Sequence, residues 1–258
     1  MSDIIYKELI KDMTWSYSRI GCFKDCQYRW FLKYIRHESE EPMFYSSYGS
    51  YIHKLIEKYY KCQITKEELP IRFLLGFRDK VQGDRPSAAI AEKYLAAGLD
   101  YFKTFKPFNL NTISVEEKFE FELGDKKFVG FIDYLGEKDG EFWVIDNKSR
   151  ALKPRSNRPK PTIKDKELDE MLRQLYIYSA AVEQKYGKFP TYLCFNCFRN
   201  GVFIKERFDK QKYEEAIQWA LDNIAEIEET NDFIPNVEFF QCSYLCGLNE
   251  GCCYWQER

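Results

Sequence analysis

Two periodicities of apolar residues divide the chain. Apolar side chains recur at helical spacing in six segments: residues 18–35, 46–61, 65–80, 87–103, 167–186 and 212–230. From residue 111 the period shortens to two, and five segments are predicted to be strands: residues 113–123, 128–135, 142–145, 191–198 and 202–208. Strands that alternate with long helices predict an α/β fold class with helical additions at the N-terminal side.

A β-hairpin is predicted around Asp139-Gly140, which separates the apolar runs at residues 128–135 and 142–145. Asp-Gly favours a two-residue turn because both of its residues must accept a positive φ. In that turn Lys138 faces Glu141, and the same register places Asp133 directly opposite Asp146.

Asp133 and Asp146 would then be two facing carboxylates. Opposed side chains have Cβ atoms about 4.5–5.5 Å apart, and like charges at that separation destabilise the strand pair. Asp146 also ends an apolar run, where an unpaired carboxylate is costly to bury. A hard divalent cation, Mg²⁺ or Mn²⁺, would offset both effects. Alternation puts Lys148 on the same face and turns Asn147 away. The alternative is a strand end at which these side chains are simply solvated.

Composition narrows the class of protein. The 258 residues contain no linker rich in Ser, Gly and Pro, which predicts a single domain. Its parts would be a helical region (residues 1–110), a core (111–210) and a helix with a cysteine-rich tail (211–258). The N-terminal segment lacks the apolar core of a signal peptide, and no run of about 18 apolar residues occurs, so we expect a cytosolic protein without a membrane span.

The net charge of −2 gives no general affinity for polyanions, so a nucleic acid would need a local basic patch. Residues 148–166 carry a net charge of +7 and three prolines, and they directly follow the two carboxylates. Such a segment is either a solvated loop or a contact surface for phosphates. The candidate nucleic-acid-binding residues are Arg150, Lys153, Arg155, Arg158 and Lys160.

The tail concentrates thiols. Four of the nine cysteines lie in the last 17 residues, and no secretory signal favours a disulfide framework. Cys242, Cys246 and Cys252 (or Cys253) are close enough in sequence to bind a metal or an iron–sulfur centre, with a fourth ligand from elsewhere in the fold. The alternative is a redox-sensitive terminus.

Two further cysteine pairs have simpler interpretations. Cys22 and Cys26 stand four residues apart in a predicted helix, which places them on one face. Cys194 and Cys197 lie on a predicted strand, where an odd separation points their side chains to opposite faces. We expect the second pair to be core residues.

Taken together, these residues resemble the RecB-like branch of the PD-(D/E)XK nuclease superfamily, close to its iron–sulfur exonucleases of the AddB and CRISPR-associated types. The resemblance spans nearly the whole chain. Five segments carry it: Gly49-x3-His53-x3-Glu57, Gly130-Phe-Ile-Asp133, Asp146-Asn-Lys148, Gln174-x3-Tyr178, and the N-terminal segment that contains Cys26. The tail spacing C-x3-C and Gln27 after Cys26, where the family has C-x2-C and proline, depart from the pattern.

The resemblance implies a restriction-endonuclease-like core of order αβββαβ, with a mixed central sheet flanked by helices. It further implies a DNA nuclease, most simply an exonuclease on single-stranded ends that leaves 5′-phosphates, in repair, CRISPR adaptation or phage recombination. The alternative is an inactive nucleic-acid-binding or recombination accessory protein.

The resemblance also assigns roles to residues. The ligands of Mg²⁺ or Mn²⁺ would be His53, Asp133, Asp146 and the backbone carbonyl of Asn147. Lys148 would orient or help to deprotonate a water, while Gln174 and Tyr178 would position substrate. A [4Fe-4S] cluster, or Zn²⁺ in the alternative, would be bound by Cys26, Cys242, Cys246 and Cys252.

Overall fold

A five-stranded sheet forms the centre of the protein in the computed structural model, which describes residues 2–256. In the sheet order β1-β2-β3-β4-β5, β3 and β4 pair parallel and all other neighbours pair antiparallel. This mixed sheet confirms the predicted α/β class. The strands are β1 (Asn111–Leu123), β2 (Lys126–Lys138), β3 (Glu141–Lys148), β4 (Tyr192–Cys197) and β5 (Val202–Arg207).

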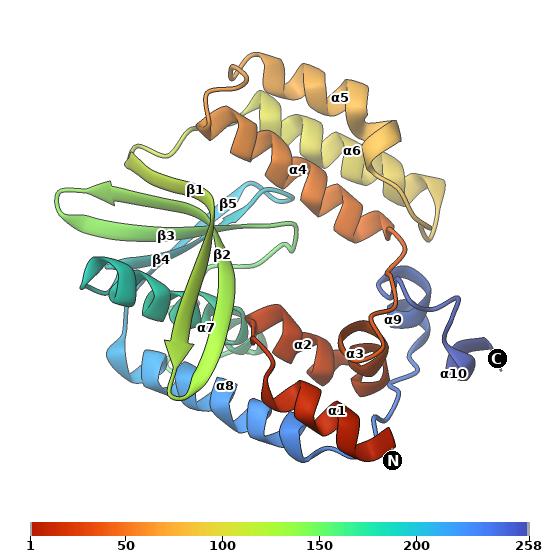
Figure 1. Ribbon diagram of the computed structural model, residues 1–258. Coiled ribbons are helices and arrows are strands. Elements are labelled where there is room, and N and C mark those ends of the chain that lie inside the picture. The colour runs from red at the N-terminus through yellow and green to blue at the C-terminus, as the bar shows by residue number, and fades with distance from the viewer. Residues whose placement is uncertain (1, 257–258) are drawn as a thin grey trace.

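Helices flank the sheet on both faces. They are α1 (Ser2–Lys11), α2 (Tyr17–Asp25), α3 (Gln27–Tyr34), α4 (Phe44–Tyr60), α5 (Glu68–Lys80), α6 (Ala88–Lys103), α7 (Ile163–Tyr186), α8 (Lys210–Glu229), α9 (Phe239–Tyr244) and α10 (Cys253–Gln256). In Figure 1, α4, α5 and α6 cover one face of the sheet, and α7 and α8 cover the other. Both chain ends lie on the same side of the molecule, with α9 near α3. None of the described helices is long and apolar enough to cross a bilayer.

The hairpin between β2 and β3 has the predicted register. Lys138 pairs with Glu141, and the register continues to Tyr134 with Ile145. Asp139 and Gly140 have φ values of +54° and +81°, as a two-residue turn of this kind requires. The position of each side chain on β2 relative to β3 therefore follows from these two turn residues.

Helix α7 makes the crossover that a parallel β3–β4 pair needs. It begins at a capping box formed by Thr162 and Asp165 and ends at Gly187, whose φ of +73° suits a left-handed C-cap. Its buried residues Leu168, Leu172 and Leu175 pack into the main core beneath the sheet. The crossover thereby brings α7 alongside the ends of β2 and β3.

Two large hydrophobic clusters lie on opposite sides of the sheet. One joins the sheet to α2, α7 and α8, and the other lies among α4, α5 and α6. Cys197 belongs to the first cluster, whereas Cys194 packs with Tyr134 and Ile145 on the other side. Both cysteines are fully buried, so the prediction that they point to opposite faces and serve the core is confirmed.

The single helix predicted over residues 18–35 was wrong. The chain breaks at Cys26, whose backbone is extended (φ −163°, ψ 112°) and whose thiol accepts the Arg29 N–H as the N-cap of α3. Cys22 is buried in the main core, so Cys22 and Cys26 do not share one helical face. Cysteine is not among the residues that usually form an N-cap, which are Ser, Thr, Asp and Asn, so nothing in the sequence indicated a new helix at this position.

Candidate active site

Two buried aspartates lie where the β2–β3 register ends. Tyr134 and Ile145 form its last pair. Asp133 and Asp146 follow one position beyond it, so the predicted direct pairing of the two aspartates is not part of the β2–β3 ladder. Asp133 accepts the backbone N–H of Asn147 on its Oδ2 at 2.7 Å. The two aspartates are 9 % and 4 % exposed, which leaves their charges little solvent screening.

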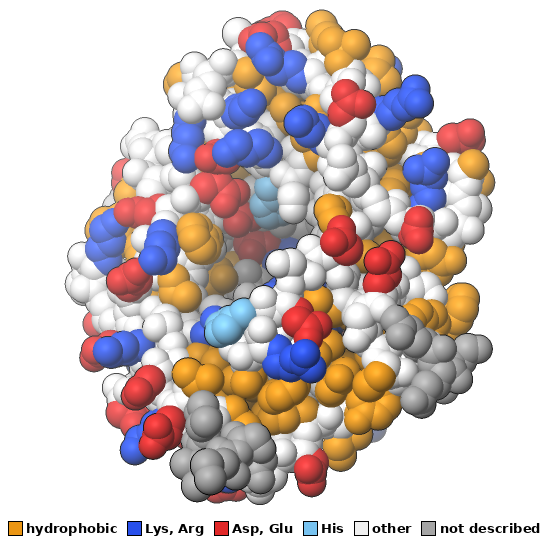
Figure 2. Space-filling model, turned by 45° about the vertical axis from the view of Figure 1, so that its right-hand side comes forward, with side chains coloured by type: hydrophobic (Ala, Val, Ile, Leu, Met, Phe, Trp, Pro, Cys, Tyr) orange, Lys and Arg blue, Asp and Glu red, His pale blue; other side chains and the backbone are white. Residues whose placement is uncertain are grey.

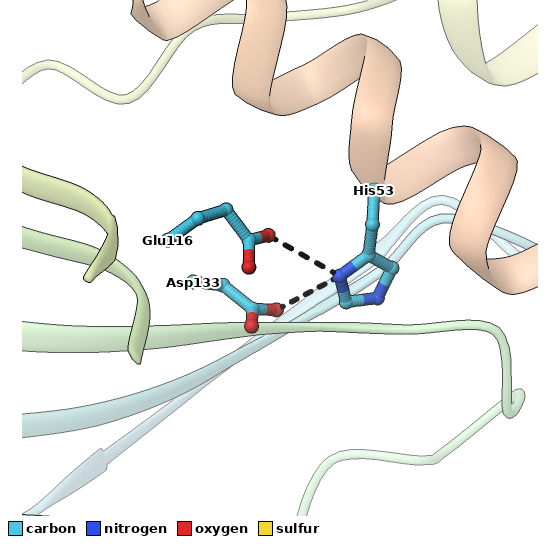
Figure 3. A group of neighbouring side chains, drawn as sticks. All are labelled: His53, Glu116 and Asp133. Atoms are coloured by element: carbon cyan, nitrogen blue, oxygen red, sulfur yellow. Dashed lines mark ion pairs between the residues drawn. The ribbon is translucent and has the colours of Figure 1, made fainter. Parts of the chain in front are cut away.

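His53 on α4 and Glu116 on β1 complete an acidic cluster with Asp133 (Figure 3). His53 Nδ1 lies 3.3 Å from Asp133 Oδ2 and 3.6 Å from Glu116 Oε1. One donor atom from each of these residues lies within 4.8 Å of the other two. An imidazole and carboxylate oxygens are suitable ligands for Mn²⁺ or Mg²⁺.

Glu116 was not predicted from the sequence. Val115 pairs with Tyr134 and Glu117 pairs with Ile132, so Glu116 stands opposite Asp133 across the β1–β2 register. Its φ of +51° is in the left-handed region, a local strain of the kind that proteins keep at functional sites. The signal was present, because a two-residue turn at Gly124-Asp125 fixes this register as Asp139-Gly140 fixes the next.

Burial and charge repulsion make this cluster retain protons. Burial, and after it the charge of Asp146, raises the pKa of the Asp133 carboxyl above its ordinary value. Burial lowers the pKa of His53, but the contact with Glu116 and the charges of Asp133 and Asp146 outweigh it and raise that pKa. A divalent cation can replace these protons because it supplies the positive charge that the cluster lacks.

Lys148, Gln174 and Tyr178 form a chain of polar contacts beside Asp146. Lys148 Nζ lies 2.8 Å from Asp146 Oδ2 and donates to Gln174 Oε1 at 2.7 Å. Gln174 Nε2 in turn donates to the Tyr178 hydroxyl at 3.3 Å. Burial is the main cause that raises the pKa of Tyr178, so this hydroxyl stays protonated. The lysine is therefore held in place from two sides.

Gly130 makes room for Tyr178. A Cβ atom at residue 130 would lie 2.5 Å from Tyr178 Cε1, closer than real Cβ contacts allow. The glycine of the Gly130-Phe-Ile-Asp133 segment thus lets the tyrosine ring pack on β2. Gly49 differs, because a Cβ there would meet Ser149 Oγ at 3.7 Å, an ordinary contact.

Asn147 turns away from Asp146, as alternation predicts. Its Oδ1 accepts a hydrogen bond from Asn196 Nδ2 at 2.7 Å, and Asn196 also donates to the Tyr101 hydroxyl. Together with the bond from its N–H to Asp133, these contacts fix the peptide between β2 and β4.

On the surface, acidic side chains gather around and within a hollow in the middle of one face (Figure 2).

A comparison with known families matches the PD-(D/E)XK nuclease superfamily over residues 14–253. The chain belongs to this superfamily. No curated protein matches the chain. Solved structures that match include a candidate exonuclease from Eubacterium rectale, at 11 % identity and a TM-score of 0.48, with 93 % of this chain and 86 % of that chain covered. Another is the protein SSO0001, at 17 % identity and a TM-score of 0.32, with 97 % of each chain covered.

In this member of the nuclease superfamily, Asp146-Asn147-Lys148 has the sequence (D/E)-x-Lys from which the superfamily takes its name. Asp133 follows Ile132 in the sequence, where that name has proline before the aspartate. The structure brings the predicted residues His53, Asp133, Asp146 and Lys148 into one site. Gln174 and Tyr178 adjoin it through Lys148.

Four cysteines line a second site, a small cavity between the two chain ends that we name the thiol cavity. Its lining includes Cys26, Cys242, Cys246 and Cys252. Cys253 is exposed and instead contacts the Tyr28 hydroxyl at 3.6 Å. Burial raises the pKa of the Cys242, Cys246 and Cys252 thiols. The predicted set with Cys252, rather than Cys253, is thus the one that the fold assembles.

The basic segment of this nuclease-superfamily protein is only partly free for a ligand. Arg150 Nη2 lies 2.6 Å from Glu167 Oε1. Arg155 contacts both Asp169 and Glu206 within the chain. Lys153, Arg158 and Lys160 are exposed, in a stretch that forms no regular element before Ile163. Helix α7 begins there, four residues before the predicted start of the helix at residue 167.

Proposed function

We propose that the protein is a Mg²⁺- or Mn²⁺-dependent DNA nuclease that hydrolyses phosphodiesters, and that it acts as an exonuclease on single-stranded ends. One observation carries this proposal: His53, Glu116 and Asp133 converge within 4.8 Å close to the buried Asp146, which pairs with the half-buried Lys148. Two buried carboxylates that repel each other, of which Asp133 has a raised pKa and Asp146 contacts a lysine, make a costly arrangement that a bound cation would stabilise.

The residues present fit a hard divalent cation. His53, Glu116, Asp133 and Asp146 would hold it, with the Asn147 carbonyl as a further oxygen ligand. Asp146 Oδ2 supports this fit, because it is buried without a well-aligned hydrogen bond from any described residue and has only the Lys148 ammonium close by. When bound, the cation supplies Lewis acidity, which activates a water and neutralises charge on the phosphate.

Lys148 contributes a fixed positive charge to the reaction. Its ammonium can donate to the attacking water or to a phosphate oxygen on which negative charge develops. Gln174 holds Lys148 through its Oε1 and reaches Tyr178 through its Nε2. These two residues therefore position the lysine and offer further donors near the scissile phosphate.

The test uses linear single-stranded DNA labelled separately at each end, and circular single-stranded DNA, with Mg²⁺, Mn²⁺ or EDTA. We expect metal-dependent loss of mononucleotides from a linear end, no cleavage of circles, and no activity in Asp146→Ala. Cleavage that survives Asp146→Ala would remove this site from the reaction. Cleaved circles would show an endonuclease, and metal-dependent binding without cleavage would favour an accessory protein.

For the thiol cavity we propose a [4Fe-4S] cluster bound by Cys26, Cys242, Cys246 and Cys252. Tetrahedral zinc with bonds of about 2.3 Å would bring its sulfur ligands to within about 4 Å of one another. Among the described residues, no three cysteines bring their sulfur atoms within 4.8 Å of one another, so a wider group fits the spacing better.

Purification under anaerobic conditions tests this assignment. We expect brown protein that contains iron and acid-labile sulfide, and loss of both in Cys252→Ser. Colourless protein with one equivalent of zinc would replace the cluster with a structural zinc site.

A further inference from the structure

A groove of about 820 Å³ opens next to the candidate active site. Its walls come from four places in the chain: Tyr45 at the start of α4, Lys93 and Tyr94 on α6, Arg199 in the β4–β5 turn, and Phe240 on α9. The nuclease site described above does not account for this groove.

The groove is basic on an otherwise acidic protein. Three of its lining residues are Lys93, Arg150 and Arg199, and none is acidic, although the chain as a whole has a net charge of −2. The nearby cavity beside α4 has the opposite character, with Glu41, Asp84 and Glu250 in its lining. Charge complementarity therefore points to a polyanion in the groove.

Aromatic rings form a second feature of the groove. The rings of Phe240 and Tyr45 lie 5.9 Å apart, and those of Tyr45 and Tyr94 lie 5.3 Å apart. The Arg199 guanidinium lies over the Tyr94 ring and donates to its hydroxyl. Phe240 is 44 % exposed, an apolar ring with a free surface beside cationic side chains. Rings and cations in one groove are the features with which proteins hold single-stranded nucleic acid.

The floor of the groove is formed by the residues that directly follow β3. Ser149, Arg150 and Ala151 line it, and they directly follow Lys148 at the end of β3. The floor of the groove therefore begins one residue along the chain from Lys148.

We propose that this groove holds the single-stranded DNA next to the scissile phosphate, with bases stacked on Phe240 and Tyr45 and phosphates against Lys93 and Arg199. This inference rests on the proposed nuclease function and adds the path of its substrate. A volume of about 820 Å³ is that of a small-ligand site, which has room for a few nucleotides of one strand but not for a duplex.

The tail that carries the cysteines forms one wall of this path. Phe240 and Leu245 line the groove, while Cys242 and Cys246 of the same segment line the thiol cavity. In Figure 1, α9 lies beside the start of α4. Binding of single-stranded DNA should therefore require a folded tail as well as the catalytic residues.

The test measures binding of a fluorescent oligo(dT) to the full-length protein in EDTA, so that cleavage does not interfere. Phe240→Ala should weaken binding about 5- to 150-fold, as loss of one stacked base does. The matched control is Phe239→Ala, because Phe239 is 63 % exposed on the same helix and does not line the groove.

Lys93→Gln/Arg199→Gln should flatten the slope of log affinity against log salt by about 1.4, because each phosphate contact to a single strand contributes about 0.7. Lys103→Gln/Arg207→Gln removes the same two charges from exposed positions outside the groove and should leave that slope unchanged. Melting temperatures identify any variant that fails to fold, and Lys93→Gln alone then replaces the double variant.

Wild-type affinity and salt slope in both groove variants would overturn the inference. If the wild type cleaves DNA and the groove variants bind normally, the path is wrong while the nuclease function stands. If the wild type binds through the groove but cleaves under no condition, the nuclease function fails and the groove remains a binding site. Equal competition by a blunt duplex would also overturn the assignment to a single strand.

Discussion

The candidate active site and the thiol cavity assemble their ligands in different ways. His53, Glu116, Asp133 and Asp146 stand on α4, β1, β2 and β3, which are long elements that pack or pair along their length. The cysteines of the thiol cavity stand on the N-cap of α3, on the six-residue α9 and on the loop that follows it.

This difference determines what a bound group does at each place. In the active site, strand register fixes the carboxylates before any cation arrives, so the cation relieves repulsion. Isolated helices as short as α9 are marginal in water. The contacts that hold the tail include Asn236 N–H to Cys26 Sγ at 3.3 Å and Glu41 N–H to the Gly247 carbonyl at 2.7 Å. A group bound by the thiols would therefore stabilise structure, whereas the cation would serve chemistry.

The sharpest test of this contrast is Cys252→Ser against Cys253→Ser. Loss of a cavity thiol should lower the melting temperature by about 10 °C, since losing a cross-link costs roughly 2–5 kcal/mol and each kcal/mol shifts the midpoint by roughly 2–4 °C. Calorimetry of anaerobic protein measures it. Cys253→Ser should leave the melting temperature unchanged, because Cys253 is exposed and does not line the cavity. Equal shifts in both variants would show that the cavity holds no structural group.

Glu116→Gln should weaken cation binding at the candidate active site without lowering the melting temperature as the thiol-cavity variant does. Removing one charged oxygen from beside His53 should weaken Mn²⁺ binding by about 10- to 100-fold, as the loss of a supporting metal contact does. Titration calorimetry measures the affinity, and Glu120→Gln, an exposed glutamate on the same strand, is the control. An unchanged affinity would place Glu116 outside the cation site.

Two glycine variants compare packing beside the active site. Gly130→Ala should destabilise the protein by about 1–3 kcal/mol, because its methyl group would lie 2.5 Å from the Tyr178 ring. Gly49→Ala should stabilise it by about 0.5–1 kcal/mol, since residue 49 lies within α4 and has room for a Cβ. Urea denaturation gives both values. A Gly130→Ala variant as stable as the wild type would contradict the packing described for Tyr178.

The smallest expected effect is on pH dependence. The raised pKa values of His53 and Asp133 mean that Mn²⁺ must displace protons, so its apparent affinity should rise with pH. His53, with a pKa raised to about 9, keeps about one proton between pH 7 and pH 8, and Asp133, with a pKa raised to about 7, keeps part of a second, so the gain over this range should be about tenfold or slightly more. Calorimetry in buffers of different ionisation enthalpy counts the protons released. No release at pH 7 would show that the cluster is already deprotonated.

Much of the core was predictable because short-range signals fix it. Asp139-Gly140 determined the β2–β3 register, which runs as predicted to Tyr134 and Ile145 and ends one position before Asp133 and Asp146. Gly124-Asp125 carried equal information for β1, but Glu116 does not belong to any recognisable motif and was missed. Its left-handed backbone is also set by the sheet rather than by its own side chain.

Long-range packing explains the other errors. The helical period continues through Cys26, and only contacts with the distant residues of the tail show that the chain turns there. Helices α9 and α10 lack the length that makes an apolar period visible in sequence. The groove could not be predicted for the same reason, because its walls come from four separate segments.

The meeting of the two chain ends has a consequence for biosynthesis. Asn236 contacts a thiol 210 residues earlier in the chain, and translation at about 5–20 residues per second separates these two residues by about 10–40 s. During that interval the catalytic strands can already pair, but the ribosome has not yet released the wall that carries Phe240. A nascent or prematurely terminated polypeptide would thus contain the acidic cluster without one wall of the proposed DNA groove.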